Sequence, residues 1–153
     1  MIFTTGLRYI YSDLFDSKFT PRVYLVYHLN DNIALKGGVS KGYKTPAAKQ
    51  LTNGYYNYAN NNAYFGNPDL KPEESINYEL GVDFMVFDFA HYSTTGFITD
   101  FTNQISSEDL TGMQNNDINC SNGIVCKRPI NLGKTQTKGI EFALIPKLTM
   151  VLA

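Results

Sequence analysis

Six segments of the chain alternate apolar and polar residues with a period of two, and almost nothing in the sequence suggests a helix. The clearest is SINYELGVDF at 75–84, where the even-numbered residues are apolar and the odd-numbered residues are polar or glycine. Such alternation is typical of a β-strand with one apolar face. We therefore predict an all-β chain whose strands pair antiparallel in sequence order, near 5–12, 18–30, 32–44, 75–86, 90–104 and 130–144.

The connections between these strands differ in length. Asp31-Asn32 and the stretch VFDFA at 86–90 are short, whereas 47–74 and 106–128 are long, polar and rich in Asn, Gly and Tyr. A tilted strand crosses a bilayer with about 9 to 11 residues, and outer-membrane barrels alternate short periplasmic turns with long external loops. The pattern favours a segment of an antiparallel up-and-down transmembrane β-barrel. A soluble β-sandwich is the alternative, because it also alternates strands and needs no bilayer.

Composition sets broader limits. The 153 residues correspond to about one domain, and the net charge of -1 argues against nucleic acid as a partner. No stretch approaches the roughly 18 apolar residues of a membrane helix. Residues 1–10 have neither the basic start nor the apolar run of a signal peptide. By these criteria alone the chain would be classed as soluble and cytosolic.

The motif Gly38-x-Ser40-x-Gly42 matches the spacing of a hydrolase nucleophile elbow. An elbow requires a strand, a sharp turn and then a helix, followed by an acid and a histidine. Here the strand pattern continues past Gly42, Pro46 blocks early helix formation, and the chain holds 2 histidines. We therefore expect Ser40 and the two glycines to be small wall residues, and the chain to have no catalytic residue.

Metal and cysteine chemistry is limited. His28 and His91 lie on predicted strands without Cys or carboxylate neighbours at ligand spacing, so we expect neither a metal site nor a cofactor. Cys120 and Cys126 enclose SNGIV in a predicted external loop. In an oxidising compartment they are expected to form a local disulfide, whose small closed loop would contribute roughly 2 kcal/mol. Two free thiols are the alternative.

Four stretches together resemble TonB-dependent outer-membrane receptors, particularly the ferric-siderophore and colicin receptor branch. They are FTPRVYLVY, GVSKGYKTP, GNPDLKPEESINYELGVDF and TKGIEF, in this order and spacing within about residues 6 to 144. The resemblance implies a middle segment of a barrel of about 22 strands, closed by an N-terminal plug domain. It also implies the outer membrane of a Gram-negative bacterium, outer-membrane lipid around the wall, a ferric siderophore as substrate, and energy from the inner-membrane TonB complex.

The polar strand face would line the lumen of such a barrel. A Lys or Arg pointed at lipid costs about 2 to 4 kcal/mol near the bilayer midplane, so charged strand residues are expected to point inward. We expect them to hydrogen-bond the plug rather than the ligand. The predicted lumen-facing residues are Lys36, Asn77, Glu79, Asp83, Asn131 and Glu141.

Ligand capture is predicted in the loop at 43–67. Its aromatic rings and ammonium groups suit an anionic, aromatic iron chelate through stacking, cation–π contact and charge. For Tyr43 and Tyr64, a place at the membrane interface is the alternative. Haem receptors of this family carry a histidine between motifs like YKTP and NPDL, and 47–66 hold none, which favours a siderophore over haem. The predicted ligand residues are Tyr43, Lys44, Lys49, Tyr55, Tyr56, Tyr58 and Tyr64.

Six strands cannot close a barrel of this class, and open strand edges are not tolerated in lipid. The sequence shows no plug domain, no energy-coupling box and no terminal aromatic signature for barrel assembly. We therefore expect residues 1–153 to be a partial barrel whose function depends on a longer parent protein.

Overall fold

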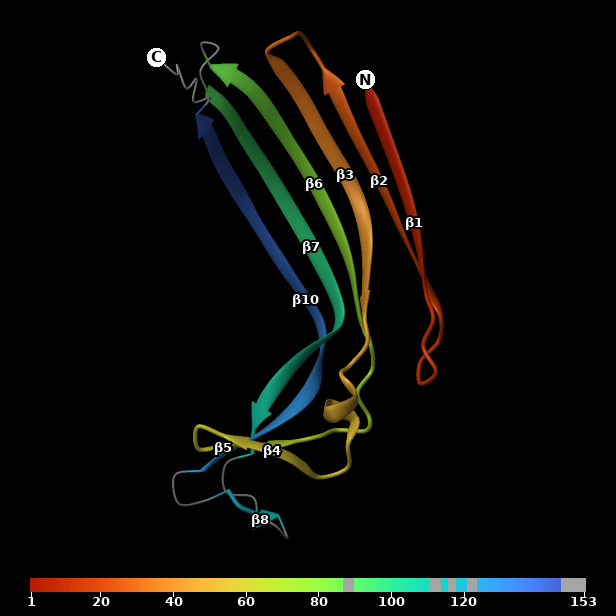
Figure 1. Ribbon diagram of the computed structural model, residues 1–153, viewed down its shortest axis with the longest axis vertical. Coiled ribbons are helices and arrows are strands. Elements are labelled where there is room, and N and C mark those ends of the chain that lie inside the picture. The colour runs from red at the N-terminus through yellow and green to blue at the C-terminus, as the bar shows by residue number, and fades with distance from the viewer. Residues whose placement is uncertain (87–89, 111–113, 116–117, 121–123, 147–153) are drawn as a thin grey trace, which may run out of the picture. The chain divides into compact units, whose positions relative to one another are not determined.

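The computed structural model describes residues 1–86, 90–110, 114–115, 118–120 and 124–146, which are mostly β-strand (Figure 1). No helix among these residues is long and apolar enough to cross a membrane. Six long strands are β1 (Ile2–Ile10), β2 (Lys18–His28), β3 (Ile33–Lys44), β6 (Glu73–Val86), β7 (Ala90–Asp109) and β10 (Val125–Pro146). The shorter elements are the 3-10 helix η1 (Ala48–Leu51) and the strands β4 (Tyr55–Ala59), β5 (Asn62–Phe65), β8 (Gln114–Asn115) and β9 (Ile118–Asn119).

The six predicted strands correspond to the six long strands, and their predicted order is confirmed. Neighbouring strands bond in the order β1-β2-β3-β6-β7-β10-β5-β4. Three of the strands have boundaries that differ clearly from the prediction: the first lies at Ile2–Ile10 and not at 5–12, the strand predicted at 90–104 continues to Asp109, and the last begins at Val125, five residues earlier than predicted. The long connection at 47–74 is not a structureless loop, because it contains η1, β4 and β5. Of the tight turn predicted at 86–90, residues 87–89 lie outside the described part of the chain.

The chain forms two compact units, of which the first comprises 1–42, 75–100 and 136–153. Its strand register places apolar residues opposite one another: Phe3 faces Leu25, Val23 faces Val39, and the Tyr9 and Phe19 rings lie 4.9 Å apart. These side chains lie on one face of the sheet, because alternate residues of paired strands point to the same side.

This apolar face is largely open. Leu80 is 73% exposed and Phe142 is 67% exposed, while Ile76, Val82 and Phe84 are half-buried. None of Ile76, Leu80, Val82 and Phe84 is buried in a protein core. Ala90 is the only buried hydrophobic residue that the structure describes in this unit. A soluble sandwich would have covered such a face with a second sheet.

The glycines of the Gly38-x-Ser40-x-Gly42 motif lie on β3, a continuous strand in which Ser40 pairs with Arg22. No turn and no helix follow the serine directly, so the nucleophile elbow is absent from this described segment. A Cβ at Gly38 would collide with the Tyr24 ring, and one at Gly42 would collide with the Ser75 hydroxyl. Both glycines therefore make room for side chains of neighbouring strands.

The second unit comprises 43–74 and 101–135 and has its own small core. Ala63, Phe65, Cys120 and Cys126 are buried there, with Leu110 and Ile124 packed against them. Asn60 and Asn61 both have positive φ, 49° and 58°, which is the geometry of a two-residue turn between antiparallel strands, here β4 and β5. β5 then pairs in parallel with the start of β10, matching Val125 with Asn62 and Lys127 with Tyr64.

Candidate ligand-binding site

A pocket of about 410 Å³ lies in the second unit. Its lining comes from the end of β3, η1, β4, β5, the far part of β7 and the start of β10, so segments distant in sequence meet there. The lining residues are Lys44, Gln50, Tyr56, Tyr64, Ile105, Ser106, Ser107, Lys127, Arg128 and Pro129. Aromatic, hydroxyl and cationic groups are thus combined in one cavity.

Two tyrosines form the aromatic part of the pocket. The Tyr56 and Tyr64 ring centroids lie 6.3 Å apart with an interplanar angle of 35°. Tyr55 pairs with Phe65 and Asn57 with Tyr64, so Tyr56 is the extra residue of a β-bulge. Burial raises the pKa of the Tyr56 phenol, and the neighbouring Tyr64 raises it further. Tyr56 is therefore a neutral hydrogen-bonding and stacking group at physiological pH.

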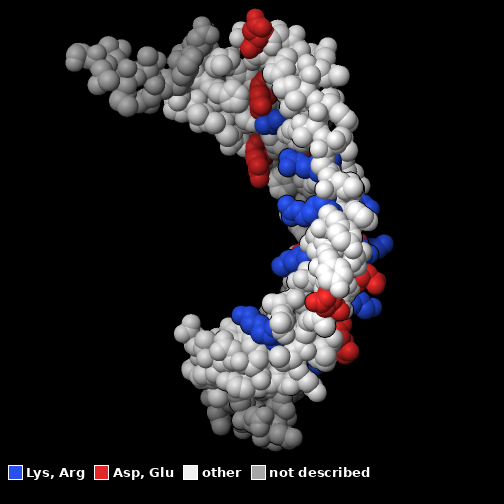
Figure 2. Space-filling view, turned by 45° about the vertical axis from the view of Figure 1, so that its right-hand side comes forward, with Lys and Arg blue, Asp and Glu red and all other residues white. Residues whose placement is uncertain are grey.

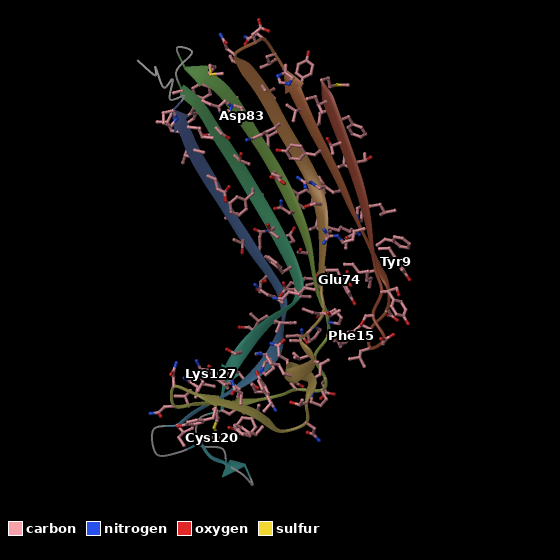
Figure 3. All side chains as sticks on the ribbon, viewed as in Figure 1. Tyr9, Phe15, Glu74, Asp83, Cys120 and Lys127 are labelled. Atoms are coloured by element: carbon pink, nitrogen blue, oxygen red, sulfur yellow. A yellow bond between two sulfur atoms is a disulfide. The ribbon has the colours of Figure 1, made fainter. Side chains whose placement is uncertain are left out.

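Positive charge exceeds negative charge in the pocket. The Arg128 guanidinium donates to Glu108 Oε1 through Nε at 3.0 Å and Nη2 at 2.6 Å. Within the described part of the chain, no ion pair neutralises Lys44 or Lys127. Figure 3 labels Lys127 in this unit, at the start of β10. Two lysines that have no ion-pair partner among the described residues thus share the pocket with two tyrosines, a combination suited to an anionic, aromatic ligand.

The structure brings together only some of the predicted ligand residues. Lys44, Tyr56 and Tyr64 line the pocket, whereas Tyr43, Lys49, Tyr55 and Tyr58 do not. Tyr55 packs edge-on against Phe65 at 5.9 Å. The Tyr58 hydroxyl donates to Asn61 Oδ1 at 3.0 Å in the β4–β5 turn, and Lys49 is exposed on η1.

Sequence reasoning missed Lys127 and Arg128, because it assigned 106–128 to a loop. In the structure both residues belong to β10, which starts at Val125. The dipeptide Lys-Arg directly after Cys126 was the available signal. The expected disulfide at Cys126 would hold the residues that follow it close to the loop at 106–128. The two basic residues at 127 and 128 could therefore have been added to the candidate site.

The chain around the pocket is held by side-chain bonds to the backbone. Asn67 Nδ2 donates to the Pro129 carbonyl at 3.0 Å, and the Ile105 amide donates to Glu73 Oε2 at 2.9 Å. Asn131, which we predicted to face a plug, uses its carboxamide differently: it bonds the backbone of Lys71 and of Asn103. Its observed role is to connect segments within the second unit.

Four of the predicted lumen residues of the first unit take part in two polar groups. Lys36 Nζ lies 2.7 Å from Asp83 Oδ1 and donates to Ser93 Oγ at 2.7 Å. Asn77 donates to Glu79 Oε1 at 3.3 Å and accepts from Thr99 Oγ1 at 2.7 Å. Figure 2 shows acidic and basic side chains in a narrow column beside broad uncharged areas.

Glu141 and Lys36 both line a second pocket of about 440 Å³ in the first unit. Among the described residues, no group of three or more His, Cys, Asp and Glu side chains is placed to hold a metal ion.

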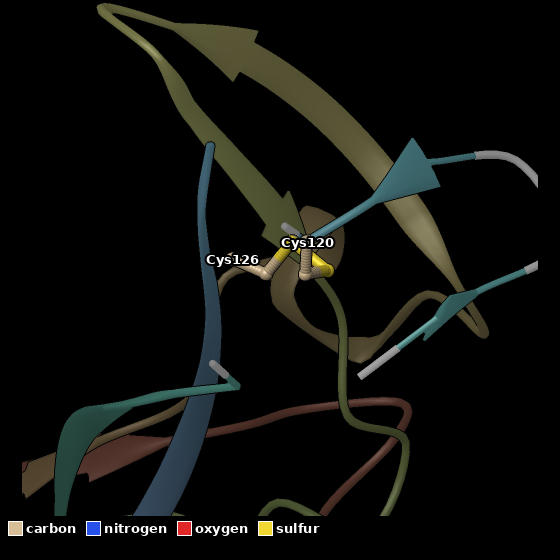
Figure 4. The surroundings of a disulfide bond; sticks show 2 residues. All are labelled: Cys120 and Cys126. Atoms are coloured by element: carbon tan, nitrogen blue, oxygen red, sulfur yellow. A yellow bond between two sulfur atoms is a disulfide. The ribbon is translucent and has the colours of Figure 1, made fainter. Parts of the chain in front are cut away.

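Cys120 and Cys126 are joined by a disulfide in the second unit, with their Cα atoms 5.5 Å apart (Figure 4). The bridge lies in the small core beside Phe65 and Ala63.

The family model and the individual relatives that match this chain agree with one another. The family model described as "TonB dependent receptor-like, beta-barrel" matches residues 1–149. An iron-regulated outer membrane virulence protein of Vibrio cholerae is 37% identical over 103 residues, covering 67% of this chain and 16% of that protein. A probable TonB-dependent siderophore receptor PirA of Acinetobacter baumannii is 37% identical over 110 residues, covering 65% of this chain and 14% of that protein.

Among solved structures, the siderophore receptor PirA from Pseudomonas aeruginosa superimposes with a TM-score of 0.72 at 24% identity. The match covers 92% of this chain and 27% of that structure, and it supports the fold. This chain therefore spans only a small part of the relatives that it matches.

Proposed function

This chain belongs to the TonB-dependent receptor β-barrel family, and we propose that it is part of an outer-membrane receptor that takes up ferric siderophores. In this proposal the open apolar face of the first unit contacts outer-membrane lipid, and the polar face lines the barrel lumen. The matched relatives are named as iron-regulated outer-membrane or siderophore-receptor proteins, which supports the proposal.

The observation that carries the substrate assignment is the pocket of the second unit. It combines the Tyr56 and Tyr64 rings with the ammonium groups of Lys44 and Lys127. A siderophore that binds iron through deprotonated oxygens gives an anionic complex, and an aromatic chelator adds flat surfaces for stacking. Charge attraction, cation–π contact and aromatic stacking therefore act together on one ligand.

The remaining partners follow from the family. A plug domain would fill the lumen beside Lys36 and Asp83, and an inner-membrane TonB complex would supply the energy for transport. The chain itself would provide wall strands and part of the external ligand site, whereas uptake would require the whole receptor.

Binding to a full-length receptor containing this segment tests the proposal. Replacing Tyr56 and Tyr64 by Ala together should weaken binding of a ferric catecholate about 5-fold to 50-fold, since each aromatic contact contributes about 1 kcal/mol. Tyr58→Ala is the matched control, because that exposed tyrosine lies outside the pocket. Haem is the control ligand.

Equal losses in the Tyr58 variant and the double variant would refute the pocket as the binding site. Tighter binding of haem than of any ferric chelate would refute the substrate class.

A further inference from the structure

We propose that the Cys120–Cys126 disulfide is a positioning element of the ligand pocket, because it fixes the start of β10 so that Lys127 lies opposite Tyr64. The inference rests on the proposed function for its ligand, but it adds a role for two residues that do not line the pocket themselves. The bridge would thereby make ligand capture sensitive to the redox state of the loop.

The first step concerns what holds β10 at this point. The parallel ladder between β5 and β10 consists of three residue pairs, Val125 with Asn62, Cys126 with Ala63 and Lys127 with Tyr64. Parallel pairing is slightly less stable per residue than antiparallel pairing, and a ladder this short is weak by itself. β10 also bonds to β7 on its other side, and a covalent constraint near Cys126 would add to that pairing in keeping the three pairs in register.

The disulfide supplies that constraint from inside the core. Cys126 is 0% exposed and packs with Ala63 and Phe65 of β5, while Cys120 is bonded to it from the preceding loop. Two backbone bonds flank the bridge: the Leu110 amide donates to the Cys126 carbonyl at 2.8 Å, and the Val125 amide donates to the Asn61 carbonyl at 3.0 Å. Cys126 is thus held by β5, by the residue following β7 and by Cys120.

The residues that follow Cys126 directly are pocket residues. Lys127, Arg128 and Pro129 all line the cavity, and Lys127 is the register partner of Tyr64, one of the two pocket tyrosines. Lys127 is joined to Cys126 by a peptide bond, so the position of the Cys126 backbone sets where the Lys127 side chain starts relative to Tyr64. Displacement of Cys126 therefore shifts Lys127 relative to the aromatic pair, whereas another pocket cation, Lys44, lies on β3 and is not attached to the bridge.

A ligand-free measurement tests the positioning directly. In the full-length receptor, Cys120 and Cys126 are both replaced by Ala, which removes the bond and keeps the site apolar. Hydrogen exchange at the amides of Leu110 and Val125 should accelerate at least about tenfold, because both amides bond groups next to the bridge. Exchange in the β2–β3 pair of the first unit is the control and should not change. Unchanged exchange at Leu110 and Val125 would overturn the proposal.

A double-mutant cycle then tests whether the bridge acts through Lys127. Removing the disulfide should weaken binding of a ferric catecholate about tenfold when Lys127 is present, and less than about twofold in a Lys127→Ala background. Equal losses in the two backgrounds would show that the bridge has only a general structural effect, and would also overturn the proposal.

If the unmodified receptor binds no ferric chelate, the proposed function fails. The positioning claim is then decided by the exchange measurement alone, so the two failures can be told apart.

Discussion

Asn131 and Lys71 exchange two hydrogen bonds, with the Lys71 amide donating to Asn131 Oδ1 at 2.8 Å and Asn131 Nδ2 donating to the Lys71 carbonyl at 2.9 Å. The same Nδ2 group also donates to the Asn103 carbonyl at 2.8 Å. The Asn131 carboxamide thus pairs with the Lys71 backbone, in the segment before β6, as a neighbouring strand would. It also satisfies the Asn103 carbonyl on β7, where the backbone φ of Asn103 is 55°. The asparagine carboxamide supplies both the acceptor and the donor that these three bonds use.

Replacing Asn131 by Leu should lower the stability of the second unit by roughly 1 to 3 kcal/mol, because backbone groups lose their partners. The most direct measurement is hydrogen exchange at the Lys71 amide, which should lose protection. Asn57→Leu on exposed β4 is the matched control and should leave that amide unchanged. Retained protection in the Asn131 variant would contradict the role assigned to this side chain.

The long strands could be predicted from sequence because alternation is a local signal. The run from Ile76 to Phe84 shows it clearly, and these residues lie on β6 as expected. The parallel pairing of β5 with β10 and the early start of β10 depend on contacts between 62–64 and 125–127. No short-range pattern encodes such a contact.

The site was predicted only in part for the same reason. The sequence showed that tyrosines and lysines are concentrated at 43–67. Which of them share a cavity depends on the bulge at Tyr56, which separates it from Tyr55 and Tyr58. Lys127 joins the site from another segment, through strand pairing that only the folded chain reveals.

Gly81 should tolerate no side chain, whereas Gly133 should. A Cβ at Gly81 would lie 2.6 Å from the Thr94 carbonyl oxygen and 2.8 Å from both Lys36 Cε and Thr95 Oγ1, whereas one at Gly133 would meet nothing within 4 Å. Gly81→Ala should therefore destabilise the wall by roughly 1 to 3 kcal/mol. Gly133→Ala should be close to neutral.

Both variants are tested by electrophoresis of unheated samples in detergent, which separates folded from unfolded receptor and so gives the folded fraction of each. Equal assembly of the Gly81 and Gly133 variants would show that the strands around Gly81 can move apart.

Tyr56 should ionise at a higher pH than an ordinary tyrosine. Burial and the neighbouring Tyr64 raise the pKa of its phenol, so the folded state favours the neutral form. The associated stabilisation is fully present below about pH 10, the ordinary value for tyrosine, and is lost as the pH rises through the raised pKa. Ultraviolet difference titration of the unmodified receptor against Tyr56→Phe should show a missing late-titrating component. If the component that the Tyr56→Phe change removes titrates at the ordinary tyrosine pKa instead, the burial of this phenol is contradicted.

Lys36 should affect transport more than binding. Its ammonium bonds Asp83 and Ser93 on the polar face of the first unit, whereas the ligand pocket lies wholly among residues of the second unit. Lys36→Met keeps the apolar stem and removes the charge, leaving the Asp83 carboxylate without its partner. In a full-length receptor we expect uptake of an iron-labelled catecholate to fall several-fold, with the equilibrium Kd changed by less than about twofold, because the lumen face is proposed to contact the plug.

A second variant separates loss of the plug contact from damage to the wall. Lys36→Met combined with Asp83→Asn removes both charges, so no unpaired carboxylate remains and the folded fraction should return toward that of the unmodified receptor. If the charges contact the plug, uptake should stay low in this double variant even though assembly recovers. If uptake recovers together with assembly in the double variant, the Lys36–Asp83 pair has a purely structural role. If the Lys36→Met variant loses binding and uptake in parallel, Lys36 acts in ligand capture instead.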